Sequence, residues 1–127
     1  GGIEAVVAGM GRHRSISGVQ QKGCWALANL AVEAVNKTAI ARAGGIEAVV
    51  AGMRAHRSIA GVQRLGCNAL ANLAVNAENT MAIARAGGID AVVAGMVAHR
   101  SIAGVQEKGC RVLGHLAVHD DENKTAI

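Results

Sequence analysis

Apolar and polar positions follow one pattern that occurs three times along the chain. In residues 3–10 the apolar side chains lie three or four positions apart, and residues 46–53 and 89–96 repeat this order. Such spacing predicts an amphipathic helix in each copy. The copies begin at Gly1, Gly44 and Gly87, a spacing of 43 residues. A period in the forties predicts one supersecondary unit stacked on copies of itself.

A longer helix is expected after the first one in each copy, over residues 16–32, 59–75 and 102–118. A polar bend precedes each long helix and ends in a serine that we expect to cap it, at Ser15, Ser58 and Ser101. Gly18 and Gly23 lie inside the first long helix and recur in the other two. Because glycine destabilises a helix interior, its recurrence indicates close contact between helices.

A brief third helix is expected over residues 37–43 and 80–86, with Asn36 and Asn79 as its N-caps. A Gly-Gly pair then permits a sharp turn into the next copy. We therefore expect an all-α chain with a single domain over residues 1–127, made of blocks 1–43, 44–86 and 87–127 with uncapped ends. The segment from Asn123 onward is expected to begin a fourth short helix, one residue later than in the earlier copies.

A unit of short, medium and long helices resembles the armadillo repeat. The motif stands here as Ala43-Gly44-Gly45-Ile46, then a Val-rich helix, and as Val19-Gln20 through Asn29-Leu30-Ala31. The resemblance covers the whole chain in three copies that agree in order and phase. The family's proline near the start of the medium helix is replaced by acids at Glu4, Glu47 and Asp90, which favour a helix start electrostatically. The resemblance implies a right-handed α-solenoid without catalytic activity.

Composition indicates which side chains form the core and whether the cysteines are reduced. The chain is 51% hydrophobic but has one Trp and no Phe or Tyr, so its core must consist of small aliphatic side chains. Cys24, Cys67 and Cys110 occupy equivalent positions, about 10 Å apart if the helices pack side by side. A disulfide needs Cα atoms within about 7 Å, which predicts buried, reduced thiols. We expect an intracellular setting, cytoplasmic or nuclear, for any natural parent.

Neither a membrane nor a strongly acidic partner is required by the sequence. No apolar run is long enough for a membrane span, so no membrane association is expected. The formal net charge of +4 gives a mild preference for acidic partners. Copies this similar fit natural duplication and design equally.

Differences between the copies gather at every fourth position of the long helices, which places them on one helix face. These positions are Gln21, Trp25, Asn29, Glu33, Arg64, Asn68, Asn72, Asn76, Glu107, Arg111, His115 and His119. We call this set the stripe. One of its positions holds Trp, Asn or Arg in different copies, so the face should not pack against the core. It is expected to line a continuous groove.

For this groove the resemblance implies binding of extended peptides, with an Asn holding the peptide backbone and a Trp one turn earlier flanking it. Trp25 and Asn29 match that pair in full, and Asn72 matches in part because Asn68 replaces the Trp. In the third copy Arg111 and His115 stand instead. Independently of the family, a carboxamide both donates and accepts hydrogen bonds and can therefore satisfy a free backbone.

Neighbouring side chains would then set specificity. Trp25 offers an apolar face and a cation–π site, while Arg64 and Arg111 favour acidic side chains. The expected function is a non-catalytic protein-interaction scaffold that binds protein or extended peptide segments. Ordinary solvated helix residues are the alternative interpretation of the stripe.

Self-assembly is the second functional hypothesis, because both ends of the stack lack a polar capping repeat. The residues expected at such contacts are Gly1, Gly2, Ile3, Val6, Thr125, Ala126 and Ile127. Docking of the last segment near the first would continue the stack head to tail, whereas like ends would form a two-fold dimer.

Other chemistry finds little support in the sequence. His115 and His119 are four residues apart, a spacing that can hold a metal, but a polar stripe explains them more simply. No nucleophile elbow or phosphate loop accompanies the Ser, His and Gly residues, so we expect no catalysis and no cofactor. With Trp25 as the single aromatic residue, nucleic-acid binding is not favoured.

Overall fold

A computed structural model describes the backbone of residues 1–126 and the side chains of residues 1–119. All regular structure in this range is helical. The helices are α1 (Gly2–Arg12), α2 (Ser17–Leu30), α3 (Ala34–Arg42), α4 (Gly45–Ala55), α5 (Ala60–Leu73), α6 (Ala77–Arg85), α7 (Gly88–Ala98) and α8 (Ala103–Ala126). The expected all-α class is therefore confirmed.

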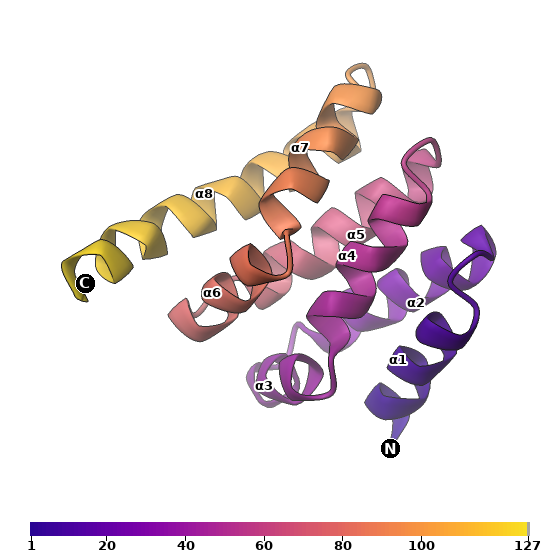
Figure 1. Cartoon of the computed structure of the whole chain (residues 1–127), viewed down its shortest axis with the longest axis horizontal. Coiled ribbons are helices and arrows are strands. Elements are labelled where there is room, and N and C mark those ends of the chain that lie inside the picture. Colours follow the sequence, from indigo (N-terminus) through magenta and orange to yellow (C-terminus); the bar gives the residue numbers. More distant parts are fainter. Residues whose placement is uncertain (127) are drawn as a thin grey trace.

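The three blocks lie side by side in chain order (Figure 1). The medium helices α1, α4 and α7 form one layer, and the long helices α2, α5 and α8 form a second layer behind it. The short helices α3 and α6 connect consecutive blocks at one edge. Within the described residues, each block packs only against its neighbour, and no helix of the first block contacts α7 or α8.

The core runs between the two layers and consists of Leu, Ile, Val, Met, Ala and Cys side chains. Burial is most complete in the middle block, where Ile46, Val49, Val62 and Leu70 are all 0% exposed. This block has a neighbour on each side, whereas each outer block has only one. No single helix in the described range is long and apolar enough to cross a membrane, although α6 and α7, bent by 73°, reach that length and apolarity together.

One buried carboxamide in each block ties the long helix to the end of the medium helix. Gln63 Nε2 donates to the carbonyl oxygens of Met53 and His56, both at 2.9 Å. Gln20 makes the same pair of bonds in the first block and Gln106 in the third. The accepting carbonyls are among those that a helix C-terminus leaves without an intrahelical partner. The glutamine thus satisfies a helix end and sets the turn between two helices.

Glycine makes room for these glutamines in the following block. A Cβ on Gly52 would lie 2.7 Å from Oε1 of Gln20, and a Cβ on Gly95 would lie 2.6 Å from Oε1 of Gln63. Within each block, the expected close helix contact is confirmed at Gly23, where a Cβ would lie 2.5 Å from Sδ of Met10. At Gly18 a Cβ would meet nothing within 4 Å, but at its equivalents Gly61 and Gly104 it would lie 2.7 Å from side-chain atoms of Gln21 and Arg64 in the preceding block, so the expected contact is made at both repeats.

The Gly-Gly turns between blocks are also confirmed. Gly44 and Gly87 have φ values of 85° and 80°, in the left-handed region that favours glycine. The next glycine approaches the preceding short helix so closely that a Cβ on Gly45 would lie 2.9 Å from the carbonyl oxygen of Ile40. Two adjacent glycines are therefore needed for two different reasons.

The expected caps are wrong at both kinds of helix start. Ile16 and Ile59 occupy the N-caps of α2 and α5 without a side-chain hydrogen bond, so Ser15 and Ser58 do not cap these helices. The bend is instead closed by the backbone, with the amide of Ile16 donating to the carbonyl of His13 at 3.0 Å. The long helix α8 likewise begins two residues after Ser101.

The short helices begin three residues earlier than expected, and their asparagines serve another purpose. Glu33 and Asn76 are the N-caps, and the Asn76 side chain accepts from the amide of Asn79 at 2.8 Å. Asn36 Nδ2 and Asn79 Nδ2 reach back to the last turn of the preceding long helix, to the carbonyls of Leu30 and Leu73, both at 2.9 Å. They hold the turn between the long and short helices.

The third block differs from the expectation, because α8 continues to Ala126 without the break expected after Val118. In the earlier blocks the asparagine that secures the break stands six residues after the leucine carbonyl it binds. Six residues after Leu116 the sequence has Glu122, and the asparagine follows at 123 because of one inserted residue. A carboxylate has no hydrogen to donate, so the interaction that ends α2 and α5 is out of register here.

Replacing the central glutamine should cost more stability than replacing its equivalent at the end of the stack. We expect Gln63→Ala to lower the free energy of unfolding by about 2–3 kcal/mol, because the Met53 carbonyl loses its donor, the His56 carbonyl keeps only the amide of Ile59, and a cavity forms in a fully buried site. Gln106→Ala removes the same pair of bonds from a half-buried site and should cost about 1 kcal/mol. Urea unfolding followed by circular dichroism measures both, and equal losses would contradict this assignment.

Candidate peptide-binding surface

The stripe predicted from the sequence lies on one exposed face of the layer formed by α2, α5 and α8. All twelve of its side chains are exposed or half-buried, and none belongs to the core. Glu33 and Asn76 lie beyond the ends of α2 and α5, at the starts of the short helices. The long helices pack side by side, so their stripes lie next to one another and form a single polar surface.

Trp25 is the largest apolar group on this surface, with 55% of its area exposed. It lines a shallow hollow together with Gln21, Lys22 and Leu65, between α2 and α5. Asn29, one turn later, is exposed, and its carboxamide has no hydrogen-bond partner among the described residues. The structure therefore brings an uncommitted indole and an uncommitted carboxamide together on one helix.

Asn72 is equivalent to Asn29 but already has a partner inside the protein. Its Nδ2 donates to the carbonyl oxygen of Ala28 at 2.9 Å and so connects α5 to α2. Asn76 caps α6 as described above. These two amides help to hold neighbouring blocks together, a role that the sequence alone did not indicate.

Basic side chains gather at the end of the stripe near α8. Lys37, which the sequence reasoning missed, extends its Nζ to the carbonyl oxygens of Ala31 and Asn72, the latter at 2.9 Å. Burial lowers the pKa of Lys37, the charge of Arg111 lowers it further, and Glu33 opposes both effects. The clue in the sequence was a difference on the short helix, where Thr80 replaces this lysine in the second block.

His115 belongs to the same basic group. Burial lowers the pKa of His115 from 6.5, and the charges of Arg111 and His119 lower it further. His119 Nε2 is 3.2 Å from the carbonyl oxygen of Val75, so this ring also connects α8 to the preceding block. Arg111, by contrast, is exposed.

The described side chains offer no metal site at this end. Among residues 1–119, no three His, Cys, Asp or Glu side chains come close enough together to hold an ion. Asp120 and Asp121, which follow His119, have side chains outside the described range.

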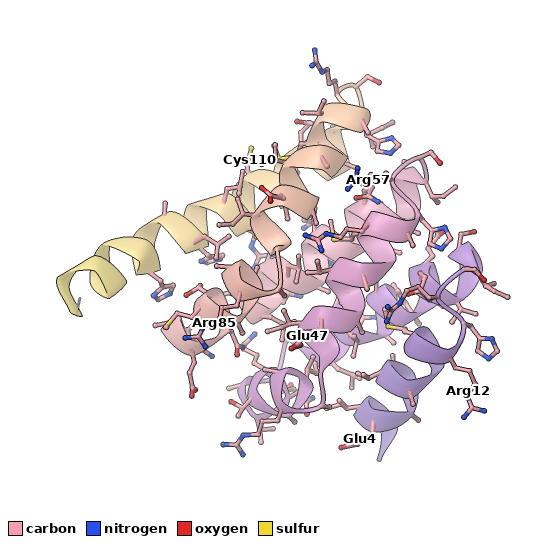
Figure 2. All side chains as sticks on the ribbon, viewed as in Figure 1. Glu4, Arg12, Glu47, Arg57, Arg85 and Cys110 are labelled. Atoms are coloured by element: carbon pink, nitrogen blue, oxygen red, sulfur yellow. The ribbon has the colours of Figure 1, made fainter. Side chains whose placement is uncertain are left out.

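Histidines in the bends between the medium and long helices link neighbouring blocks. His56 Nε2 donates to the carbonyl oxygen of Arg14 at 2.8 Å, and His99 Nε2 donates to that of Arg57 at 2.7 Å. The bend that contains Arg57 is visible at the end of α4 in Figure 2. Each bend thus contributes one polar contact per block junction.

All three cysteines were expected to be buried, but one of them is exposed. Cys24 and Cys67 are buried, and burial raises the pKa of each thiol to about 12. Cys110 is exposed and projects from the outer side of α8 (Figure 2). A following block would cover this position, as the second block covers Cys24.

The terminal residues expected to mediate self-association are only partly described. Gly1 and Gly2 are exposed, Ile3 and Val6 are half-buried, and the N-terminal ammonium pairs with Glu4 at 2.9 Å. The side chains of Thr125 and Ala126, and all of Ile127, lie outside the described residues.

Fold and surface together define a class: an all-helical protein of three similar blocks with a variable polar surface on one layer. No protein-family model matches the chain, and no curated protein does. It is similar to the crystal structure of an engineered protein, a target of the Northeast Structural Genomics Consortium, with a TM-score of 0.79 and 28% sequence identity. The match covers 92% of this chain and 46% of the other, so the chain spans a little under half of that protein.

The two equivalent asparagines should respond differently to truncation. Both Asn→Ala changes gain the same helix propensity, so the hydrogen bond of Asn72 accounts for the difference. We expect Asn72→Ala to be less stable than Asn29→Ala by about 1 kcal/mol, the net value of one such bond. Chemical unfolding of the two variants tests this, and an equal effect would mean that the bond to Ala28 contributes nothing.

His115 should make stability fall with acidification. Its pKa in the folded chain lies below 6.5, so the unfolded chain binds more protons between these two values and gains stability there as pH falls. Relative to wild type, His115→Asn should therefore become progressively more stable from pH 7 towards pH 5. The difference should level off below the folded pKa. Thermal melts across this range measure it, and a difference independent of pH would contradict the expectation.

Proposed function

We propose that the chain is a non-catalytic interaction scaffold that binds an extended, acidic peptide segment along the stripe. The observation that carries this proposal is the combination of Trp25, 55% exposed, with Asn29, an uncommitted carboxamide one turn away. An extended ligand has backbone N–H and C=O groups at regular intervals, and an Asn side chain can satisfy one of each. An exposed indole supplies apolar contact area, as hot-spot residues at interfaces do.

The finer description of the fold belongs to the same proposal. We propose a right-handed α-solenoid of armadillo type, in which the stripe lines the concave side. The order of short, medium and long helices and the contact of each block with only its neighbour support this arrangement. The near-identity of the blocks and the similarity to an engineered protein support a designed origin for this chain.

Charge supports an acidic ligand. Arg64 and Arg111 are exposed on the stripe, and Lys37 and His115 lie close enough to Arg111 for its charge to lower their pKa values. An acidic side chain placed beside Arg111 and Lys37 would relieve the repulsion between these two charges. Because exposed charges are screened by salt, binding of such a ligand should weaken as ionic strength rises.

Removing the Trp and Asn pair should weaken peptide binding. For the double variant Trp25→Ala and Asn29→Ala, we expect about a tenfold loss of affinity for an extended acidic peptide, equivalent to about 1.4 kcal/mol. Fluorescence anisotropy of a labelled peptide rich in Asp and Glu measures it. Unchanged affinity in the double variant would show that the peptide binds elsewhere.

Charge removal provides a matched test of where the acidic side chains bind. Arg111→Gln, on the stripe, should weaken binding about three- to tenfold, because a charge-assisted hydrogen bond is lost. Arg57→Gln removes the same charge from the bend after α4, away from the stripe, and should change affinity by less than about twofold. Equal losses would indicate non-specific attraction by net charge. A peptide in which Lys replaces every acid should not bind.

A further inference from the structure

We propose that the chain binds a second copy of itself head to tail, with the α1–α2 face of one molecule on the α7–α8 face of another. The contact would repeat the interface that the chain already forms twice between its own neighbouring blocks. This proposal does not rest on peptide binding, because it uses the two end faces of the stack; one stripe residue, Asn29, lies at the edge of the contact.

Equivalent positions show which side chains the missing neighbour would cover at the α7–α8 face. Ile46 and Val50 are 0% and 2% exposed in the middle block, whereas their equivalents Ile89 and Val93 are 42% and 44% exposed. Cys67 is buried and Cys110 is exposed. In the first block, which has a following block, the equivalents Ile3 and Val7 are half-buried and Cys24 is buried, so these positions are most exposed where no following block covers them.

The α1–α2 face shows the complementary pattern. Val62 and Leu73 are 0% exposed in the middle block, but Val19 and Leu30 in the first block are only half-buried. An apolar groove runs between α1 and α2 over this area, lined by Val6, Met10, Val19 and Ala26 among others. These positions are covered inside the chain by the preceding block.

Polar groups at the two faces are also complementary, in one direction only. Inside the chain, Gly52 receives Gln20 and Gly95 receives Gln63. Gln106, on the α7–α8 face, has no glycine in front of it, while a Cβ on Gly9, on the α1–α2 face, would meet nothing within 4 Å. Stacking in the same register would place Gln106 of one copy against Gly9 of the next.

Two further hydrogen bonds would continue in the same register. The series in which His56 donates to Arg14 and His99 to Arg57 would extend from His13 to the carbonyl of Arg100 in the preceding copy. The bond from Asn72 to Ala28 would extend from Asn29 to the carbonyl of Gly114. Donors lie on the α1–α2 face and acceptors on the α7–α8 face, so two like faces could not form these bonds. A head-to-tail contact is therefore favoured over a two-fold dimer.

The direct test is the solution mass of the intact chain by light scattering over a concentration series. The mass should rise above 12.8 kDa, the mass of one chain, through successive multiples as concentration increases. Gly9→Leu should hold the mass at that of one chain, because the new side chain occupies the place of Gln106 from the preceding copy. In the isolated chain the position is open, so the variant should stay folded by circular dichroism.

Gly11→Leu is the matched control on the same helix. A Cβ there also meets nothing within 4 Å, but the equivalent positions hold Arg54 and Val97, so the repeated interface accepts a side chain. This variant should assemble like the wild type. A wild-type mass that stays at one chain up to millimolar concentration overturns the proposal, as does a Gly9→Leu variant that assembles normally.

Mixing distinguishes the head-to-tail contact from a two-fold one. Val93→Lys places a charge on the exposed α7–α8 face and should also remain a single chain. Gly9→Leu keeps an intact α7–α8 face and Val93→Lys keeps an intact α1–α2 face, so an equimolar mixture should double in mass and stop there. Cys110 of the Gly9→Leu chain, followed separately by mass spectrometry, should react with maleimide at least tenfold more slowly in that mixture than in Gly9→Leu alone, whereas Cys110 of the Val93→Lys chain should react at an unchanged rate. Self-association of either variant alone, or a mixture that stays at one chain, overturns the head-to-tail assignment.

Discussion

The buried glutamine carboxamide is the constraint on which the block structure depends. Gln63 ties α5 to the end of α4, and its equivalents do the same in the other blocks. These bonds come with a loss of stability, because the Oε1 atoms of Gln20 and Gln63 are buried without a hydrogen-bond partner. Each such atom destabilises the fold by about 1–3 kcal/mol. A side chain of this length also requires a glycine in the next block, at Gly52 or Gly95. One residue therefore determines both the angle within a block and the approach of its neighbour.

Periodicity, glycine spacing and the acidic helix starts were enough to predict the eight helices of the described residues, apart from where α8 ends. The same patterns also predicted that the stripe is exposed. The caps were mispredicted because local preference favoured Ser15 and Asn36, whereas the carboxamides of Gln20 and Asn36 make longer-range bonds to helix ends. Such bonds depend on where two helices meet. Helix periodicity gives each helix face but not the position at which another helix crosses it.

The parts of the surface that the sequence did not predict have the same origin. Asn72 and Asn29 look alike in their blocks, yet only Asn72 has a preceding helix whose carbonyl it can reach. Cys110 repeats Cys24 and Cys67 but lacks the block that would bury it. Lys37 was missed because its effect on the surface comes from α3, while the sequence comparison followed the long helices. In each case the hydrogen bonds or the burial of equivalent residues differ because the neighbouring helices differ, and not because of their own helix.

A chain built this way separates the positions that hold it together from those that can vary. Core and junction positions are fixed by close approach: a Cβ on Gly66 would lie 2.6 Å from Cγ of Met53, so even one added methyl group requires a shift. Stripe positions without such contacts can vary, and Trp25, Asn68 and Arg111 occupy one of them in turn. Binding preference can thus change from block to block while the helix packing stays the same. The core residues at the two end faces are the same as those at the junctions between blocks, and this makes the two faces complementary to each other. Residues that are buried in the middle block therefore identify the equivalent residues that the outer blocks expose.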